Sequence, residues 1–312
     1  MLVSVIIPCY RSERTIGKVV RLTKGELERA GHACEFVLVN DCSPDGTFAE
    51  IARLAAEGLP VTGIDLARNF GQHAALMAGM RHASGDVVLL MDDDMQTHPS
   101  QVAALLCGLD DPRLDVVFAR YPERREKLWR RLGSAFTRWS LRVMAGVPAG
   151  IVPSSFVAMR SGVARAVVEY TGPFPFVTGL IFQSTSRVGD IPIEHFDREE
   201  GESGYTLRSL VRLWSTILNF SLVPLRIASL VGAAMGIVGL CAALFLVVRK
   251  LVVPDIAIGW SSMMVTTLVC SGLIILFMGV VGEYVGRIFM TANRAPQYVV
   301  REQVGGRPEG DR

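Results

Sequence analysis

The chain has 312 residues, of which 50% are hydrophobic and only 20% are charged. This composition is too apolar for an ordinary soluble protein, and the length allows one large domain with an appendage. The net charge of +2 gives no case for a nucleic-acid partner, because proteins that bind nucleic acid carry a strong positive excess.

Strand-like and helix-like stretches alternate through residues 1–95. Apolar runs predict strands at 2–7, 35–39, 61–66 and 87–91, with helical segments between them. This alternation predicts an α/β domain with a mostly parallel sheet and helices on both faces. Ligands of such sheets bind beyond the carboxyl ends of the strands. Residues that follow a strand are therefore expected on one rim, and these are Pro8, Tyr10, Asp41, Arg68 and Asp92.

The apolar run from Val87 to Met91 ends in three carboxylates, Asp92, Asp93 and Asp94. Unpaired charges are not tolerated within a buried sheet, so this acidic triplet is expected where the strand emerges into a crevice. Alternate residues of an extended segment point the same way, which predicts that Asp92 and Asp94 converge while Asp93 faces elsewhere. Together with Gln96 they offer hard oxygen ligands, which suit Mg²⁺ or Mn²⁺. The alternative is an acidic turn that only caps a strand.

The sequence lacks two common nucleotide-binding motifs. No glycine-rich dinucleotide fingerprint follows the first strand, and no phosphate loop ending in Gly-Lys-Ser/Thr occurs. Hydride transfer and P-loop ATPase chemistry are therefore not expected. A diphosphate can still bind through a metal ion held by the acidic triplet, because Mg²⁺ commonly bridges carboxylates and substrate phosphates.

Two segments combine basic residues with an apolar stripe. The strand that ends at Arg120 is followed by a basic stretch, comprising Arg124, Arg125, Lys127, Arg130 and Arg131. Apolar residues then recur at helical spacing over 132–143, and a second such pattern covers 207–218. Both patterns are typical of amphipathic helices that lie on a membrane surface. For 132–143, a helix packed on its own domain is the alternative.

Two long uncharged runs follow, Ile227–Val248 and Ser262–Gly282. As a helix, each spans roughly 30 Å at about 1.5 Å per residue, which predicts two transmembrane helices. Arginines outside the two runs outnumber Arg249 and Lys250 between them, so the N-terminal domain and both termini are predicted to be cytoplasmic. The predicted organisation is a domain over 1–205, a juxtamembrane amphipathic helix over 206–224, a two-helix transmembrane region over 225–290 and a cytoplasmic tail over 291–312. The tail after Gln303 is expected to be disordered.

Several motifs resemble those of known enzymes. Residues 5–10, 39–47 and 92–99 are similar to the signatures of family-2 glycosyltransferases of the GT-A fold. Residues 68–73, 198–205, 224–226 and 282–288 resemble the polyprenyl-phosphate branch, which includes dolichol-phosphate mannose synthases and undecaprenyl-phosphate formamido-arabinose transferases. The resemblance covers almost the whole chain. It implies a Rossmann-like GT-A domain and a metal-dependent, inverting enzyme of the bacterial inner membrane. Such an enzyme moves one sugar from a nucleotide-sugar, expected to be a UDP-sugar, to undecaprenyl phosphate for cell-envelope glycan, lipid A or O-antigen modification.

The resemblance also implies residue roles. The residues implied to bind the nucleotide-sugar are Pro8, Tyr10, Asp41, Arg68, Asp92 and Asp93. The implied ligands of Mg²⁺ or Mn²⁺ are Asp92, Asp94 and Gln96. The residues implied to bind the acceptor phosphate are Arg120, Arg130, Arg131, Arg198, Ser203 and Tyr205. The catalytic set is Asp92, Asp94, Arg120, Arg130 and Arg198. The implied partners are the nucleotide-sugar, undecaprenyl phosphate, the lipid bilayer and further copies of the chain in a tetramer.

The chain departs from the family pattern at two places. Arg11 and Ser12 precede Glu13 where the family commonly has an acidic residue directly after the Tyr10 turn, and Ser154 stands where it commonly has Asp. Because of Ser154, a non-catalytic, membrane-anchored binder of sugar nucleotides is an alternative. A processive polysaccharide synthase is not favoured, because its Gln-x-x-Arg-Trp segment is missing. The histidines that could touch a substrate are His73, His98 and His195, although lone histidines are more often structural.

Overall fold

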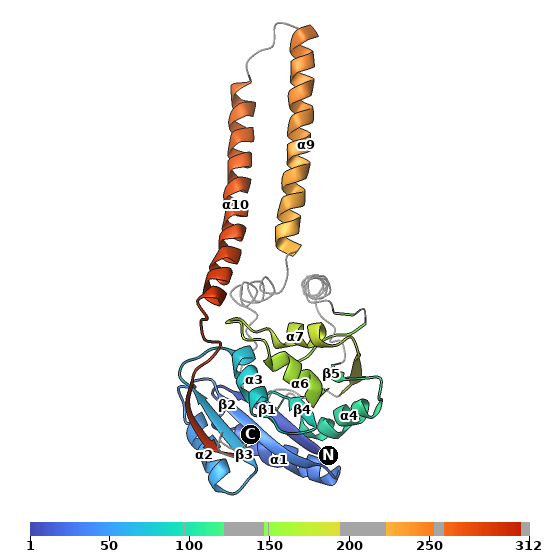
Figure 1. The fold of residues 1–312 in the computed structure, drawn as a ribbon, viewed down its shortest axis with the longest axis vertical. Coiled ribbons are helices and arrows are strands. Elements are labelled where there is room, and N and C mark those ends of the chain that lie inside the picture. Colours follow the sequence, from blue (N-terminus) through green and yellow to red (C-terminus); the bar gives the residue numbers. More distant parts are fainter. Residues whose placement is uncertain (96–97, 122–146, 149, 194–222, 253–258, 307–312) are drawn as a thin grey trace. The chain divides into compact units, whose positions relative to one another are not determined.

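The computed structural model describes residues 1–312 except 96–97, 122–146, 149, 194–222, 253–258 and 307–312 (Figure 1). The described residues belong to two compact units, Met1–Ile217 with Arg294–Arg312, and Leu218–Asn293. The segments predicted as amphipathic helices, 132–143 and 207–218, lie outside the described residues. So do Gln96, Arg130, Arg131, His195, Arg198, Ser203 and Tyr205.

The first unit is built on a sheet that has eight strands in the described part of the chain, in the order β7-β5-β6-β4-β1-β2-β3-β8. The strands are β1 (Leu2–Cys9), β2 (Ala33–Asn40), β3 (Val61–Leu66), β4 (Val87–Leu90), β5 (Val116–Arg120), β6 (Val157–Arg160), β7 (Val188–Pro192) and β8 (Val300–Gly305). Only β6 and β8 run antiparallel to their neighbours. The predicted α/β domain with a mostly parallel sheet is confirmed.

Helices cover both faces of this sheet (Figure 1). They are α1 (Ile16–Arg29), α2 (Thr47–Ala56), α3 (Gln72–Arg81), α4 (Val102–Cys107), α6 (Ser161–Val168) and α7 (Val177–Ser184), with short 3₁₀ turns η1 (Pro99–Gln101) and η2 (Gly108–Asp110). Helices α1, α2 and α4 share one buried core with alternate residues of β1, such as Val5 and Ile7. Helix α3 packs on the other face of β1, where a Cβ on Gly79 would collide with Ile6. Each fully buried aliphatic side chain contributes about 1.5–3 kcal/mol, so the residues of β1, buried on both faces, add strongly to the stability of this unit.

Strand β1 continues through Pro8 to Cys9, although the sequence predicts that it ends at Ile7. Proline lacks the N–H that a central strand donates to its neighbour. In β1 the backbone groups of Ile6 and Pro8 point toward β4, and the ladder between these two strands ends at Ile6. No strand partner therefore waits for an N–H at Pro8, and the missing donor costs nothing. On the opposite side, β1 stays paired with β2 as far as Cys9 and Asn40.

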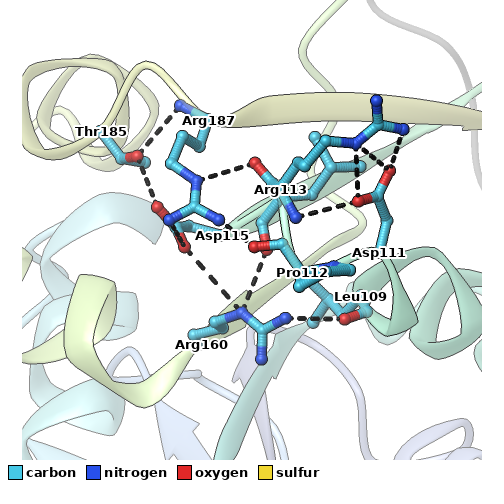
Figure 2. A network of polar contacts seen from close by, with 9 residues as sticks. Leu109, Asp111, Pro112, Arg113, Asp115, Arg160, Thr185 and Arg187 are labelled. Atoms are coloured by element: carbon cyan, nitrogen blue, oxygen red, sulfur yellow. Dashed lines mark hydrogen bonds and ion pairs between the residues drawn. The ribbon is translucent and has the colours of Figure 1, made fainter.

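Figure 2 shows a polar network that includes Asp115, Arg160 and Arg187. It joins residues just before β5 and β7 to the carboxyl end of β6, at the opposite edge of the sheet from Arg120. Thr185 donates to Asp115 at 2.9 Å, and both Arg160 and Arg187 approach the same carboxylate. Arg187 also donates to the carbonyl of Arg113 at 2.8 Å. The two arginine side chains are 42% and 52% exposed, so their ion pairs with Asp115 add little free energy, but the network defines the geometry of this edge.

The C-terminal tail returns to the sheet. Strand β8 pairs antiparallel with β3 from Gly305 to Val300, and Val304 packs against the hydrophobic core. The prediction that the chain is disordered directly after Gln303 is therefore wrong for Val304 and Gly305. A single exposed strand has a weak sequence signal, and here the ladder with β3 and the contacts of one valine stabilise it.

The second unit consists of α9 (Val223–Val252) and α10 (Trp260–Ala292). Among the described residues, one segment, Val269–Ala292, is long and apolar enough to cross a membrane, and Ala228–Gly239 is a shorter apolar segment. The helical state of both predicted spans is confirmed, whereas two membrane crossings remain a prediction.

Candidate functional site

A cleft of about 650 Å³ opens at the carboxyl edge of the sheet. The loops after β1, β2 and β4 and the start of α3 form its walls. The lining residues are Pro8, Cys9, Tyr10, Arg11, Glu13, Arg14, Thr15, Asp41, Asp45, Gln72, Asp92, Asp93 and Asp94. The predicted rim thus brings together every described nucleotide and metal candidate except Arg68.

Backbone strain is concentrated at this edge. Left-handed φ angles occur at Arg11 (61°), Cys42 (52°), Gly71 (91°) and Met95 (60°), one in each loop that follows β1 to β4. The described residues contain only one other non-glycine residue with positive φ, Arg294. Such conformations cost about 1–3 kcal/mol for a non-glycine residue and persist where surrounding contacts impose them. The loops after β1, β2 and β4, which hold Arg11, Cys42 and Met95, are therefore held in specific shapes around the cleft.

Asp92 is held from two sides. The side-chain amide of Gln72, at the start of α3, donates to one carboxylate oxygen at 2.8 Å, and the hydroxyl of Ser155 donates to the other at 2.5 Å. Because Gln72 and Ser155 come from different elements, the carboxylate has one defined orientation. No spacing in the sequence relates these two residues to Asp92, and the sequence analysis missed both.

Asp93 is turned toward Ser12, whose hydroxyl donates to its carboxylate. The pKa of Asp93 is raised to about 6, mainly by burial and also by the neighbouring charges of Asp92 and Asp94, against the lowering effect of the Ser12 bond. All three aspartates nevertheless line the same cleft. Strand β4 ends at Leu90, before the triplet. The alternation of side-chain direction along a strand, from which Asp93 is predicted to face elsewhere, therefore does not apply to the three aspartates.

The acidic triplet fits a hard divalent cation by its chemistry. Three adjacent carboxylates concentrate negative charge in a cleft, and carboxylate oxygens are the ligands that Mg²⁺ and Mn²⁺ prefer. Within the described residues, no group of three or more His, Cys, Asp or Glu side chains is arranged to hold a metal ion. The predicted ligand set has two carboxylates and the amide of Gln96, and that amide is outside the described residues.

Asp41 supports the wall of the cleft. Its two carboxylate oxygens accept hydrogen bonds from the backbone N–H groups of Phe70 at 2.7 Å and Gly71 at 2.8 Å. Burial raises the pKa of Asp41, and these two bonds only partly offset that rise. The carboxylate thereby ties the loop after β2 to the loop that begins α3.

Two predicted arginines are not in the cleft lining. Arg68 lies over the ring of Phe70, with 4.6 Å between the guanidinium carbon and the ring centroid. Arg120 ends β5, where its Nε is 3.7 Å from Asp190. Arg68 follows β3 at the carboxyl edge as predicted, and Arg120 lies at the carboxyl end of β5, but neither contacts the acidic triplet in the described structure.

Both departures from the family pattern have local partners. The backbone N–H of Ser12 donates to Thr47 at 2.9 Å, so this residue joins the loop after β1 to the start of α2 while its hydroxyl reaches Asp93. The acidic residue that follows, Glu13, accepts the backbone N–H of Gly46 at 3.1 Å. Ser154 donates to the carbonyl of Phe156 at 2.9 Å. Its neighbour Ser155, not Ser154, reaches the acidic triplet.

The two described histidine candidates have structural surroundings. His98 caps η1 by accepting the N–H of Ser100. His73 meets the ring of Phe176 edge-on at 5.2 Å, and its buried Nδ1 has no hydrogen-bond partner among the described residues. Burial lowers the pKa of His73 to about 4.

Acidification should therefore destabilise the first unit through His73. In the unfolded chain His73 takes up a proton near pH 6.5, but in the folded protein it does so only near pH 4. The unfolded state therefore gains free energy from protonation first, and the free energy of unfolding falls as the pH drops from 6.5 toward 4. At pH 5 the loss is about 2 kcal/mol. We expect the Tm of His73→Gln to fall less than that of wild type between pH 7 and pH 5. The Tm is measured by tryptophan fluorescence of detergent-solubilised protein. His98→Gln is the control, and an equal pH slope in wild type and His73→Gln would contradict the assignment.

The chain is similar to known proteins over most of its length. The model of Glycosyl transferase family 2 matches residues 4–156. The undecaprenyl-phosphate 4-deoxy-4-formamido-L-arabinose transferase of Pseudomonas paraeruginosa is 31% identical, over 98% of this chain and 91% of the relative. The protein of the same name from Edwardsiella ictaluri is also 31% identical, over 97% of this chain and 94% of the relative.

Among solved structures, glucosyl-3-phosphoglycerate synthase of Mycobacterium tuberculosis in complex with Mn²⁺, UDP and phosphoglyceric acid has a TM-score of 0.52. It is 18% identical, and the match covers 70% of this chain and 77% of that one. This likeness concerns the fold alone and confirms the predicted GT-A-like domain. Because the family model matches residues 4–156 and relatives that are 31% identical match over nearly the full length of both chains, the chain belongs to glycosyl transferase family 2.

Proposed function

We propose that the protein is a membrane-bound, inverting glycosyltransferase that moves one sugar from a UDP-sugar to undecaprenyl phosphate. The observation that carries this proposal is the convergence of Pro8, Tyr10, Asp41 and the acidic triplet in one cleft at the carboxyl edge of the sheet. The names of the relatives at 31% identity support the lipid acceptor.

The donor fits the cleft by its chemistry. Tyr10 is 47% exposed and borders the cleft, so its ring is available to a nucleobase. A divalent cation bound by Asp92, Asp94 and Gln96 would neutralise charge on the departing diphosphate. Gln72 and Ser155 orient Asp92 for that task. Ser12 and the buried Asp93 brace the same wall.

The acceptor needs positioning more than activation. A phosphate monoester has a second pKa near 6, so undecaprenyl phosphate is largely dianionic at neutral pH and its oxygen can attack the anomeric carbon without a strong base. We assign Arg120, Arg130, Arg131, Arg198, Ser203 and Tyr205 to hold this phosphate. Arg120, the described member, is half exposed at the carboxyl edge, where an anion can reach its guanidinium group.

The second unit fits a lipid bilayer. Large apolar side chains are exposed on its helices, among them Leu230 and Ile275 at 70% each and Met278 at 69%. A surface of this kind is stable in hydrocarbon and not in water. We propose that α9 and α10 both cross the bacterial inner membrane and that the catalytic unit and both termini are cytoplasmic. Assembly as a tetramer remains a prediction.

A screen of radiolabelled UDP-sugars with purified full-length protein tests the proposal. We expect label to pass into organic-extractable lipid for one donor when undecaprenyl phosphate and Mn²⁺ or Mg²⁺ are present. The transfer should stop with EDTA and return when metal is added back. Undecaprenol, which lacks the phosphate, is the matched control acceptor and should receive no label.

Ser154, in place of the family's usual aspartate, keeps one alternative open: a binder of sugar nucleotides without transferase activity. Such a protein would bind UDP in a metal-dependent way and transfer no sugar from any donor in the screen. Turnover with any UDP-sugar would exclude it.

A further inference from the structure

Strand β8, the return strand and the last described strand, extends the sheet beside β3, and β3 in turn neighbours β2, whose following loop borders the cleft. After α10 ends at Ala292, residues 293–299 lead to β8, which pairs with the outer edge of β3. The carbonyl of Val299 accepts the backbone N–H of Ala67 at 2.8 Å. The segment that leads into β8 is thus bonded to the loop between β3 and α3, and Gln72, the first residue of α3 after that loop, lines the cleft.

A β-bulge lies where β8 meets this loop. In the register of the two strands, Glu302 is opposite Asp65 and Val300 is opposite Leu66, which leaves Arg301 as the extra residue. Bulges occur frequently beside active sites, where they re-aim a side chain. Here the bulged residue is an arginine, the side chain with the most hydrogen-bond donors.

Arg301 contacts the loops after both β2 and β3. Its Nη1 donates to the Asp65 carboxylate at 3.1 Å, and its Nη2 donates to the carbonyl of Ala67 at 2.8 Å. The same Nη2 is 3.7 Å from the sulfur of Cys42. Asp65 is only 4% exposed, so Arg301 supplies the positive charge that this buried carboxylate needs.

A short chain of hydrogen bonds leads from Asp65 to the cleft. The side-chain NH₂ of Asn40 donates to the other oxygen of Asp65 at 2.7 Å, and the side-chain oxygen Oδ1 of Asn40 accepts the backbone N–H of Ser43 at 3.3 Å. Asp41 lies between Asn40 and Ser43 and binds the backbone of Phe70 and Gly71. Arg301 therefore braces the two loops that Asp41 joins, without lining the cleft itself.

We propose that Arg301 is a positioning residue for the donor, and that the return strand thereby forms part of the frame of the nucleoside-diphosphate site. The inference rests on the proposed function, since the ligand of the cleft is taken to be the nucleotide of a UDP-sugar. Arg301 acts through the loops and touches neither the reacting atoms nor the acceptor. Its loss should weaken donor binding and leave the chemical step and the lipid acceptor unaffected.

The test compares Arg301→Ala and Arg301→Lys with Arg187→Ala in the full-length protein in nanodiscs. Arg187 is a matched control, because its side chain is 52% exposed against 53% for Arg301 and it also binds a carboxylate and main-chain carbonyls, at the opposite edge of the sheet (Figure 2). The measurements are the Kd of UDP with Mn²⁺, the KM values of donor and undecaprenyl phosphate, kcat and Tm.

For Arg301→Ala we expect the Kd of UDP and the donor KM to rise about tenfold, the size that follows from losing a charge-assisted hydrogen bond. The values of kcat and of the acceptor KM should stay within about twofold of wild type, as should every constant of Arg187→Ala. Arg301→Lys keeps the charge near Asp65 and should recover part of the affinity. It also serves as the folded variant if the alanine protein is unstable.

An unchanged Kd of UDP in both Arg301 variants would overturn the inference, and so would an equal loss in Arg187→Ala. A fall in kcat at constant donor KM would overturn it as well. Wild-type protein that neither binds UDP nor transfers sugar would overturn the proposed function together with the inference. Normal wild-type binding with unchanged variants would overturn the inference alone.

Discussion

Asp94→Asn is expected to lower kcat for transfer of sugar to undecaprenyl phosphate by about a hundredfold to a thousandfold. Asparagine has nearly the shape of aspartate, so the loop after β4 should keep its fold while the cleft loses one of its three adjacent carboxylates. The remaining charge should hold a divalent cation more weakly, because hard cations are bound largely by carboxylate charge. The measurement is label transferred to organic-extractable lipid per minute, over a range of Mn²⁺ concentrations.

Asp110→Asn is the control, because Asp110 is an exposed carboxylate in η2 that does not line the cleft. The Mn²⁺-dependent part of UDP binding should also weaken in Asp94→Asn, which separates a lost cation from a misfolded protein. Wild-type rates in Asp94→Asn at low Mn²⁺ would show that the acidic triplet does not hold the metal.

The sequence predicts the fold well where structure depends on local pattern. Alternating apolar runs and helices define β1 to β4, and the carboxyl-edge rule brings Tyr10, Asp41 and the acidic triplet together. Strand β8 could not be predicted in the same way. It has few apolar residues, and its pairing depends on the free edge of β3, more than two hundred residues earlier in the chain.

The candidate site was predictable in outline and not in its contacts. The partners of the acidic triplet, Ser12, Gln72 and Ser155, come from three separate segments, and none has a spacing that marks it. The bulge that aims Arg301 is a feature of strand register, which a single sequence does not reveal. Long-range polar contacts of this kind follow from the assembled fold, whereas the rim follows from the order of its elements.

Asp41→Asn should cost both stability and donor affinity. The buried carboxylate of Asp41 accepts two backbone N–H groups, whereas an asparagine can accept from one and must turn its own NH₂ toward the other. One charge-assisted bond is lost and one donor is left unsatisfied, so the free energy of unfolding should fall by about 2–4 kcal/mol. For a domain of this size the Tm should fall by roughly 5–10 °C.

Asp45→Asn is the matched control for this prediction. Asp45 lines the same cleft but is exposed, and it bonds the side chains of Ser43 and Thr47. Its replacement should change the Tm much less. Because Asp41 holds the start of α3 beside the cleft, the Kd of UDP should rise in Asp41→Asn along with the fall in Tm, and added UDP should recover only part of the lost stability. A weaker Kd with an unchanged Tm would instead mean that Asp41 contacts the nucleotide directly and that the loop after β3 keeps its shape without it.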